Sequence, residues 1–223
     1  MNLSLIKQKV VQTAERFGRN PADIHLLAVS KSRRPEEIRA LYNVGQRDFG
    51  ESYSQEALPK IQALKPLPEL IWHFIGPVQS NKTADIAAHF AWVHSLSRLK
   101  IAQRLNDQRP THLPPLNVCV QVNIDAETTK SGVSPESLLD LCNKLSQLPR
   151  LKLRGLMALP TPHAHFEQQR AAFCSVRECY TQLQQQGYRL DSLSMGTSQD
   201  MIAAIAEGAT WLRIGTALFG PRL

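Results

Sequence analysis

The sequence lacks the features that mark secreted and membrane-spanning proteins. It has only four cysteines in 223 residues, without C-x-x-C spacing or a disulfide-framework pattern, and this indicates a reducing compartment. No stretch approaches the roughly 18 uninterrupted apolar residues of a membrane span. The first residues also lack a continuous apolar segment followed by a small-residue cleavage site. We therefore expect a soluble, cytoplasmic protein with no membrane partner.

The sequence also lacks a concentrated patch of charge, although it is basic overall. The formal net charge is +7 and the isoelectric point is near 9.4, values that suit a phosphorylated ligand or a nucleic acid. The densest basic stretch is only Lys31, Arg33 and Arg34, and no basic tract is interleaved with aromatic residues. This distribution argues against a nucleic-acid partner. We expect most of the excess positive charge to come from solvated lysines on the surface.

What the sequence does contain is an alternation of short β-rich apolar segments and helical segments. The composition is 43% hydrophobic and 20% charged with no linker-like stretch, so we expect one domain over residues 1–223. The expected strands are Ile24–Ser30, Asp48–Gly50, Ile71–Ile75, Ala91–Ser95, Leu116–Ile124, Leu153–Ala158, Ser192–Met195 and Trp211–Ile214. The expected helices include Pro35–Asn43, Ser97–Asn106, Pro135–Leu145, Phe166–Gln186 and Gln199–Glu207.

Eight strands separated by helices predict an α/β fold with a parallel sheet, because parallel neighbours need long crossover connections. Eight such units favour a closed (β/α)8 TIM barrel, and a doubly wound open sheet is the structural alternative. An additional helix over Leu3–Phe17 precedes the first strand and is placed where it could cover the bottom of the barrel.

Lys31 is the first candidate functional residue, because chemistry in such barrels collects where the strands end. It directly follows the first apolar run, where partial desolvation favours the neutral, nucleophilic amine. A Schiff-base lysine needs its pKa lowered from about 10.4, or its amine captured by an aldehyde. A surface lysine at a strand end is the alternative.

Two turns that combine glycine with a hydroxyl residue follow the last two expected strands. Gly196, Thr197 and Ser198 come after the seventh strand, and Gly215 and Thr216 come after the eighth. Backbone amides beside hydroxyls make an anion site, and barrels repeatedly bind phosphate with these two loops. The turns therefore predict a phosphate clamp. The alternative is that Ser198 and Thr216 are only helix N-caps.

Arg213 lies in the last expected strand and should point to the same side of the sheet as Trp211 and Gly215. An arginine inside a barrel is costly without a partner. A guanidinium that donates to the pyridine nitrogen of a bound cofactor would have one, and it would keep that nitrogen unprotonated and weaken the ring as an electron sink. A structural ion pair with Glu51 or Asp200 suits the composition equally well.

Several segments together resemble one known family. They are LLAVSK, FGESYSQE, WHFIGPVQSNK, TKSG, LRGLMALP, MGTSQDMIAAIAEG and RIGTALFG, and they cover nearly the whole chain in the right order. In aggregate they resemble the pyridoxal phosphate homeostasis protein family, which looks like the N-terminal barrel domain of alanine racemase standing alone. The resemblance implies pyridoxal 5′-phosphate bound as a Schiff base on Lys31, with Arg213 facing the pyridine nitrogen. It further implies that Ser198, Gly215 and Thr216 hold the phosphate.

The chain departs from this family in two places. The family usually reads GEN where residues 50–52 read GES, so that the hydroxyl of Ser52 replaces a side-chain amide near the ring. It usually reads MGMS where residues 195–198 read MGTS. Neither departure removes the lysine or the clamp. The candidate cofactor-binding residues are therefore Lys31, Ser52, Gly196, Ser198, Arg213, Gly215 and Thr216.

The resemblance implies cofactor handling rather than catalysis. Racemisation needs two acid/base groups on opposite faces of a carbanion, and the similar racemases draw the second from a C-terminal β domain. The sequence ends at Leu223 directly after the eighth unit, so we expect that domain to be absent and racemase turnover to be little or none. The expected protein is a monomer that captures pyridoxal phosphate reversibly, buffers its aldehyde and passes it to apo-enzymes.

Two other kinds of Schiff-base chemistry suit parts of the sequence. A pyridoxal-phosphate-dependent, racemase-like enzyme acting on amino acids would use Tyr53, His73 or Lys130 as its base. A cofactor-free aldolase would use Lys31 and the same phosphate clamp. For His73, which lies in the third expected strand, a core histidine with satisfied hydrogen bonds is the default interpretation.

Two further kinds of site are weaker. Residues 76–83, GPVQSNKT, nearly match a nucleotide-binding phosphate loop, but Asn81 replaces its second glycine and Pro77 removes an amide donor. A helix N-cap at Ser80 or Asn81 explains the segment better. His163 and His165 lie in a proline-flanked loop without nearby cysteine or carboxylate ligands, so we expect no metal.

Overall fold

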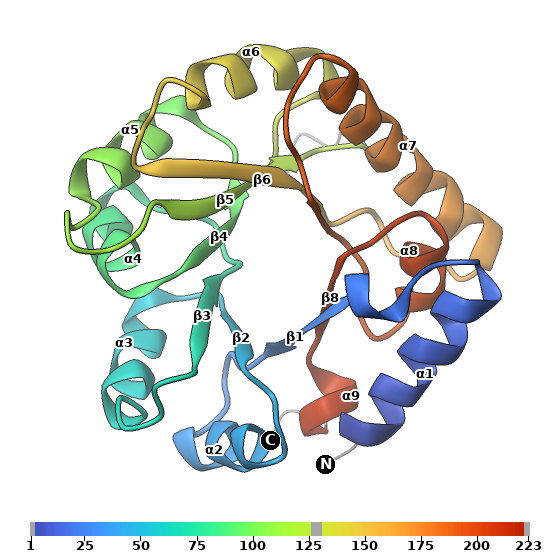
Figure 1. Cartoon of the computed structure of the whole chain (residues 1–223), viewed down its shortest axis with the longest axis horizontal. Helices are drawn as coiled ribbons and strands as arrows, with labels where there is room; N and C mark the ends of the chain where they lie inside the picture. Colours follow the sequence, from blue (N-terminus) through green and yellow to red (C-terminus); the bar gives the residue numbers. More distant parts are fainter. Residues whose placement is uncertain (1–2, 126–130, 221–223) are drawn as a thin grey trace.

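Eight short apolar segments form parallel strands that close into a barrel, in which each strand pairs with the next and β8 pairs with β1 (Figure 1). The computed structural model describes residues 3–125 and 131–220. The strands are β1 (His25–Val29), β2 (Asp48–Glu51), β3 (Ile71–Phe74), β4 (Trp92–Leu96), β5 (Leu116–Val122), β6 (Leu151–Ala158), β7 (Ser192–Ser194) and β8 (Trp211–Ile214). The predicted (β/α)8 barrel is confirmed, because β1 and β8 pair with each other, whereas in an open sheet they would be two separate edge strands.

Helices connect the strands and form an outer ring. They are α1 (Leu3–Arg16), α2 (Pro35–Asn43), α3 (Ser54–Ala63), α4 (Thr83–His89), α5 (Leu99–Gln108), α6 (Pro135–Leu145), α7 (Phe166–Gln185), α8 (Met201–Ala206) and α9 (Thr216–Phe219), with short 3₁₀ turns η1 (Pro21–Asp23) and η2 (Ser80–Lys82). α2 and α6 have the predicted bounds, because each begins with a proline whose fixed φ suits the first helical position. α3 is absent from the predicted helices, and Pro59 inside it obscures the helical pattern.

The N-terminal helix α1 exists as predicted but lies elsewhere than across the bottom of the barrel. It takes a place in the outer ring, against α8 and α9 (Figure 1). Arg19, just after this helix, donates a hydrogen bond to the carbonyl of Ile205 in α8 at 3.1 Å. Because α9 has only four residues, α1 fills the space that a full helix after β8 would cover.

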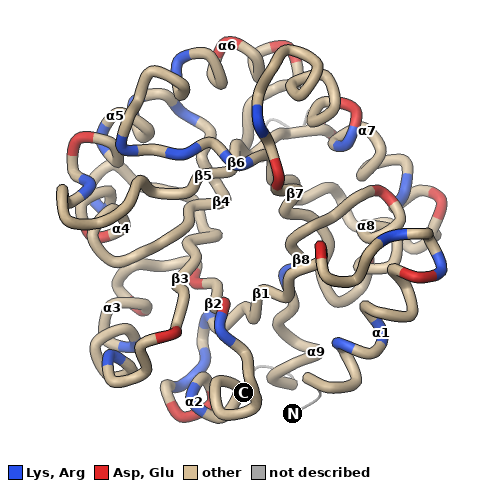
Figure 2. Tube along the Cα trace, in the orientation of Figure 1, with Lys and Arg blue, Asp and Glu red and all other residues tan. Residues whose placement is uncertain are grey.

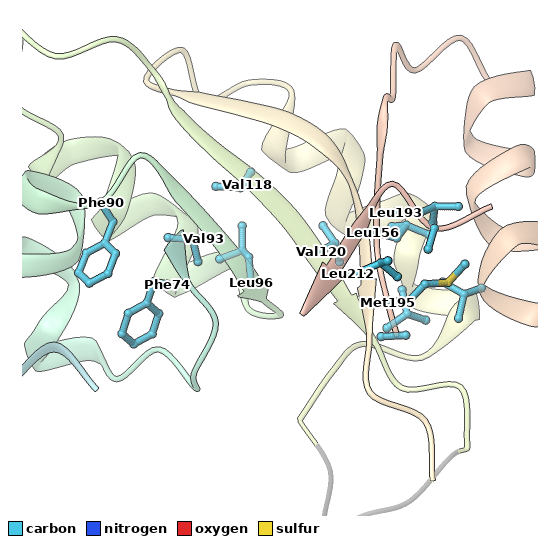
Figure 3. Packing of buried hydrophobic residues seen from close by; sticks show 14 of the residues in the cluster. Phe74, Phe90, Val93, Leu96, Val118, Val120, Leu156, Leu193, Met195 and Leu212 are labelled. Carbon is cyan, nitrogen blue, oxygen red and sulfur yellow. The ribbon is translucent and has the colours of Figure 1, made fainter. Parts of the chain in front are cut away.

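The apolar core has two parts, one on each side of the strands. The larger part lies between the strands and the helices, where Figure 3 shows Phe74 beside Phe90 and Leu193 near Leu212. The Phe74 and Phe90 rings meet edge to face with their centroids 5.3 Å apart. The smaller part fills the barrel interior and consists of Leu27, Trp92, Cys119, Met157 and Trp211. Since side chains fill the interior, a ligand has to bind at an end of the barrel.

The segment that resembles a phosphate loop has another structure. It forms η2 followed by α4, and the residue that precedes α4 is Lys82, so the predicted N-cap at Ser80 or Asn81 is wrong. Thr83 is fully buried; its hydroxyl donates to the carbonyl of Ser80 at 2.9 Å and accepts from Arg104 at 3.2 Å. A threonine engaged in this way is not available to a nucleotide.

The surface of the barrel shows no strong separation of charge. Figure 2 shows basic and acidic positions interspersed around the ring of helices, which agrees with the scattered charge of the sequence. In the part of the chain that the structure describes, no helix combines the length and apolar character needed to cross a membrane.

Candidate functional site

A cavity of about 520 Å³ lies where the carboxyl ends of the strands meet. Its wall comes from the ends of β1, β2, β3, β6, β7 and β8 and consists of Val29, Lys31, Arg33, Ser52, Ile75, Leu159, Thr197, Ser198, Gln199, Arg213, Gly215, Thr216 and Ala217. Six of the seven candidate residues are in this wall, although they come from opposite ends of the sequence. The seventh, Gly196, is buried and is not part of the wall.

Lys31 is held in a tight turn that follows β1. The backbone N–H of Ser30 donates to the carbonyl of Gly50 in β2 at 2.9 Å, which extends the sheet up to the lysine. Ser32 has a φ of 61°, a left-handed conformation that costs a non-glycine residue about 1–2 kcal/mol. Its N–H donates to the carboxylate of Glu56, which holds the turn in this conformation. Lys31 itself is half-buried.

A cluster formed by the buried Glu51 and Lys60 and the partly exposed Glu56 lies next to this turn. Lys60 Nζ donates to Glu51 at 3.0 Å and to Glu56 at 2.6 Å. It also donates to the carbonyl of Ser30 at 2.9 Å. Burial raises the pKa of the Glu51 carboxyl, while the charge of Lys60 lowers it. Because Ser30 precedes Lys31 and Glu56 binds the residue that follows it, the cluster fixes the backbone on both sides of the lysine.

The turn after β7 is shaped by a required glycine. Gly196 has a φ of 92°, and a Cβ added to it would lie 2.5 Å from the Cβ of Ala204, so that no other residue fits without a shift. The N–H and the hydroxyl of Thr197 both donate to Asp200 Oδ1, the hydroxyl at 2.9 Å. These bonds close the turn and leave Ser198 in the cavity wall.

The hydroxyl residues of the two last turns are not helix N-caps. α8 begins at Met201 and is preceded by Asp200, and α9 begins at Thr216 and is preceded by Gly215. Ser198 and Thr216 therefore occupy neither N-cap position, and both line the cavity. The N-cap interpretation of these two residues is wrong.

Arg213 points into the barrel, as its place in β8 predicts, and only 5% of it is exposed. Its Nη1 donates to the carbonyl of Ser194 and to the hydroxyl of that residue, the latter at 2.9 Å. Its Nη2 donates to the carbonyl of Ala158 at 2.8 Å. Among the described residues Glu51 binds Lys60 instead, so the ion pair of Arg213 with Glu51 does not form. Burial lowers the pKa of Arg213 to about 10, and the group keeps its charge at neutral pH.

The cavity wall also contains residues that sequence reasoning did not identify. Ile75 and Leu159 supply apolar surface directly after β3 and β6, and Leu159 is 45% exposed. Arg33 is buried, donates to the backbone carbonyl of Gly220 and lies over the ring of Phe219. The rule that strand ends meet at one mouth could have identified the two apolar residues. Arg33 depends on contacts with the far end of the chain, which no local pattern indicates.

Of the three alternative bases, Tyr53 and His73 are not among the described residues of the cavity wall. Tyr53 is 59% exposed at the start of α3, and His73 is buried inside the barrel with both ring nitrogens in hydrogen bonds. The interpretation of His73 as a satisfied core histidine is confirmed. Lys130 lies outside the described residues. His163 and His165 are exposed, and the described residues contain no group of three ligands that could hold a metal.

Comparisons with known proteins agree on one family. The alanine racemase N-terminal domain family matches residues 1–222 of the chain. The pyridoxal phosphate homeostasis protein of Pseudomonas aeruginosa is 55% identical over 221 residues, covering 99% of this chain and 94% of that protein. The protein of the same name from Escherichia coli K12 is 47% identical over 223 residues, covering 99% and 95%.

Solved structures show the same barrel. PipY of Synechococcus elongatus, solved with pyridoxal phosphate bound, is 38% identical and covers 95% of this chain and all of its own, with a TM-score of 0.84. An alanine racemase of Clostridium difficile is 16% identical with a TM-score of 0.73, and the match covers 96% of this chain but 56% of the racemase. The second likeness concerns the fold alone.

The cluster of Glu51, Glu56 and Lys60 generates a prediction about the stability of the protein and its pH dependence. We expect Lys60→Met to lower the free energy of unfolding by about 3–5 kcal/mol at neutral pH, because it leaves the buried Glu51 carboxylate without its cation. The folded-state pKa of Glu51 is already raised, and loss of Lys60 raises it further. The added loss of stability should therefore be small in acid, near the unfolded carboxyl pKa of about 4.3. It should grow as the pH rises toward the raised folded-state pKa of Glu51 in the variant, and level off above that pKa.

Urea unfolding of the wild type and the variant across this pH range measures the effect. The double variant Lys60→Met/Glu51→Gln serves as the control, since it removes the titrating group and should show a loss that no longer grows with pH. A loss of equal size at all pH values in the single variant would contradict the assignment.

Proposed function

The chain belongs to the alanine racemase N-terminal domain family, with the pyridoxal phosphate homeostasis proteins, and we propose that it binds pyridoxal 5′-phosphate at the barrel mouth and buffers it for other enzymes. The observation that carries the proposal is that Lys31, the turns after β7 and β8, and Arg213 line one cavity. Each of these groups suits a different part of the cofactor.

The cavity fits pyridoxal phosphate in size and in chemistry. About 520 Å³ lies within the range of small-molecule sites, and the wall combines apolar side chains with a few polar groups. When bound, the cofactor supplies an aldehyde that condenses reversibly with a primary amine. Lys31 is the only lysine among the described wall residues, and the fixed turn holds it at the cavity edge.

The phosphate end of the ligand would lie against the turns after β7 and β8. Ser198 and Thr216 contribute hydroxyl donors there, and Gly215 brings the backbone close without a side chain. Gly196 contributes indirectly, since its left-handed conformation turns the chain so that Ser198 reaches the wall. Hydrogen bonds to a charged phosphate are stronger than those between neutral groups, so these donors would set the affinity.

The ring end would lie between Arg213 and Ser52. Three of the five guanidinium N–H groups of Arg213 are engaged by Ser194 and Ala158, and no other described residue binds the remaining two, which would serve a ligand. A guanidinium that donates to the pyridine nitrogen keeps that nitrogen unprotonated, which makes the ring a poorer electron sink. The replacement of the family's asparagine by Ser52 shortens the polar group on this side of the cavity.

The same wall favours holding the cofactor over turning over amino acids. Racemisation needs acid/base groups on both faces of the reacting carbon. Among the described wall residues Lys31 is the only amine, and the wall contains no described histidine, tyrosine, cysteine or carboxylate. The proposed role is therefore reversible capture and release of the cofactor. We further propose that the protein works as a monomer in the cytoplasm and that apo-enzymes receive the cofactor.

Attachment at Lys31 is the first expected outcome. Incubation with pyridoxal phosphate, borohydride reduction and peptide mass measurement should show the pyridoxyl phosphate mass on Lys31, because this amine borders the cavity. Lys31→Ala should lose both the adduct and the absorbance change that Schiff-base formation produces relative to free pyridoxal phosphate. Lys65→Ala, at an exposed lysine just after α3, is the matched control and should keep both. An adduct of equal yield in Lys31→Ala would count against the site.

A second expected outcome concerns the phosphate clamp. Ser198→Ala and Thr216→Ala should each weaken binding of pyridoxal phosphate about tenfold, because each removes a hydrogen bond to a charged group. Binding of pyridoxal, which has no phosphate, should change little in these variants. Ser4→Ala, at an exposed serine of α1, controls for loss of any hydroxyl. Equal weakening for both ligands, measured by titration, would place the phosphate elsewhere.

Release without turnover is the third expected outcome. Protein loaded with pyridoxal phosphate should restore activity to the apo-form of a pyridoxal-phosphate-dependent enzyme, and Lys31→Ala treated in the same way should not. The loaded protein should form no D-alanine from L-alanine above the level seen with Lys31→Ala, as followed by chiral chromatography. Formation of D-alanine that depends on Lys31 would favour the racemase-like enzyme instead.

A further inference from the structure

A chain of hydrogen bonds runs through the barrel from its amino end to the cavity. Asp48 Oδ1 lies 2.9 Å from His73 Nε2, and His73 Nδ1 lies 2.9 Å from His94 Nε2. His94 Nδ1 is 2.7 Å from the hydroxyl of Ser194, which in turn accepts from Arg213 Nη1 at 2.9 Å. The members come from β2, β3, β4, β7 and β8, so the chain crosses the interior from wall to wall.

The middle of this chain is sealed from solvent. His73, His94 and Ser194 are all fully buried. The His73 ring stacks on Trp92 with centroids 5.5 Å apart and lies 4.9 Å from the Trp211 ring, so its orientation is fixed by packing. With both nitrogens of each histidine engaged, the two rings have no unsatisfied polar atom.

The two ends of the chain determine its direction. A carboxylate only accepts and a guanidinium only donates, so Asp48 accepts from His73 Nε2–H and Arg213 donates to Ser194. Burial lowers the pKa of both His73 and His94, so both rings are neutral and each carries one proton. His73 then accepts at Nδ1 from His94 Nε2–H, and His94 accepts at Nδ1 from the Ser194 hydroxyl. Every bond in the chain therefore points from Arg213 toward Asp48.

We propose that His94 and Ser194 are positioning residues that hold the guanidinium of Arg213 in place for the ring nitrogen of a ligand in the cavity. This inference rests on the proposed function. His94 fixes the proton of the Ser194 hydroxyl on its own side, which leaves the oxygen lone pairs directed at Arg213. Together with the carbonyls of Ser194 and Ala158, this anchor determines which two N–H groups of Arg213 remain for the ligand.

The direction of the chain can be measured without any ligand. Ring ¹⁵N spectra of the wild-type protein at neutral pH should show both His73 and His94 with the proton on Nε2. A proton on Nδ1 of either ring would reverse a bond of the chain and overturn the proposal.

The positioning role is tested by comparing two ligands, pyridoxal phosphate and its analogue in which C–H replaces the ring nitrogen. The wild type should prefer pyridoxal phosphate. Ser194→Ala and His94→Leu should reduce this preference about tenfold, because the first removes and the second misdirects the hydroxyl that accepts from the charged guanidinium of Arg213. His94→Asn keeps an acceptor near the position of Nδ1 and should retain most of the preference. A generally loosened barrel would weaken both ligands alike, and Cys119→Ala, in the inner apolar cluster, is the control for that effect.

The outcomes separate the two proposals. Variants that bind both ligands and keep the full preference would overturn the positioning role alone. A wild type that binds neither ligand would overturn the proposed function and this role with it. Equal loss of preference in His94→Asn and His94→Leu would show that the acceptor is not what matters, and would also count against the inference.

Discussion

The site depends on the pairing of β8 with β1 that closes the barrel. Ala28 pairs with Ile214, and this register brings Val29 and Gly215 to the end of the sheet side by side. A Cβ on Gly215 would lie 3.5 Å from the carbonyl oxygen of Val29. Lys31, two residues beyond Val29, therefore shares a cavity with the turn after β8. In an open sheet the same residues would lie at two opposite edges.

Closure also creates the problem of polar groups inside the barrel. A buried charge or an unpaired polar group costs several kcal/mol, and the interior of this barrel holds Arg213 and two histidines. The structure offsets this cost by joining them to one another through Ser194, with Asp48 at the other end. The inner apolar cluster packs around that chain, so the floor of the cavity is both filled and rigid.

The sequence was sufficient to predict the barrel and six of the residues that line the cavity, because both follow from where apolar runs stop. Lys31 and Ser198 could be identified as residues that follow a strand, without knowledge of their neighbours. The contacts behind them could not, because they join elements that are distant in the sequence. Nothing near Glu51 shows that Lys60 reaches it, since Pro59 conceals the helix that places the lysine. His94 likewise looks like any strand residue until β7 is known to lie opposite.

The two departures from the family pattern, at Thr197 and Ser52, have different consequences for the cavity. Thr197 lines the cavity, but its hydroxyl and N–H both bind Asp200, so this residue contributes to the shape of the turn more than to the donors offered to a ligand. Ser52 is 8% exposed in the wall, and its carbonyl occupies the space that a Cβ on Gly76 would need, 2.0 Å away. The backbone at Ser52 thus packs directly against Gly76, which follows β3, and a change of side chain at Ser52 alters the polar surface of the cavity without moving this backbone. Of the two departures, only the one at Ser52 changes what the cavity offers to a ring.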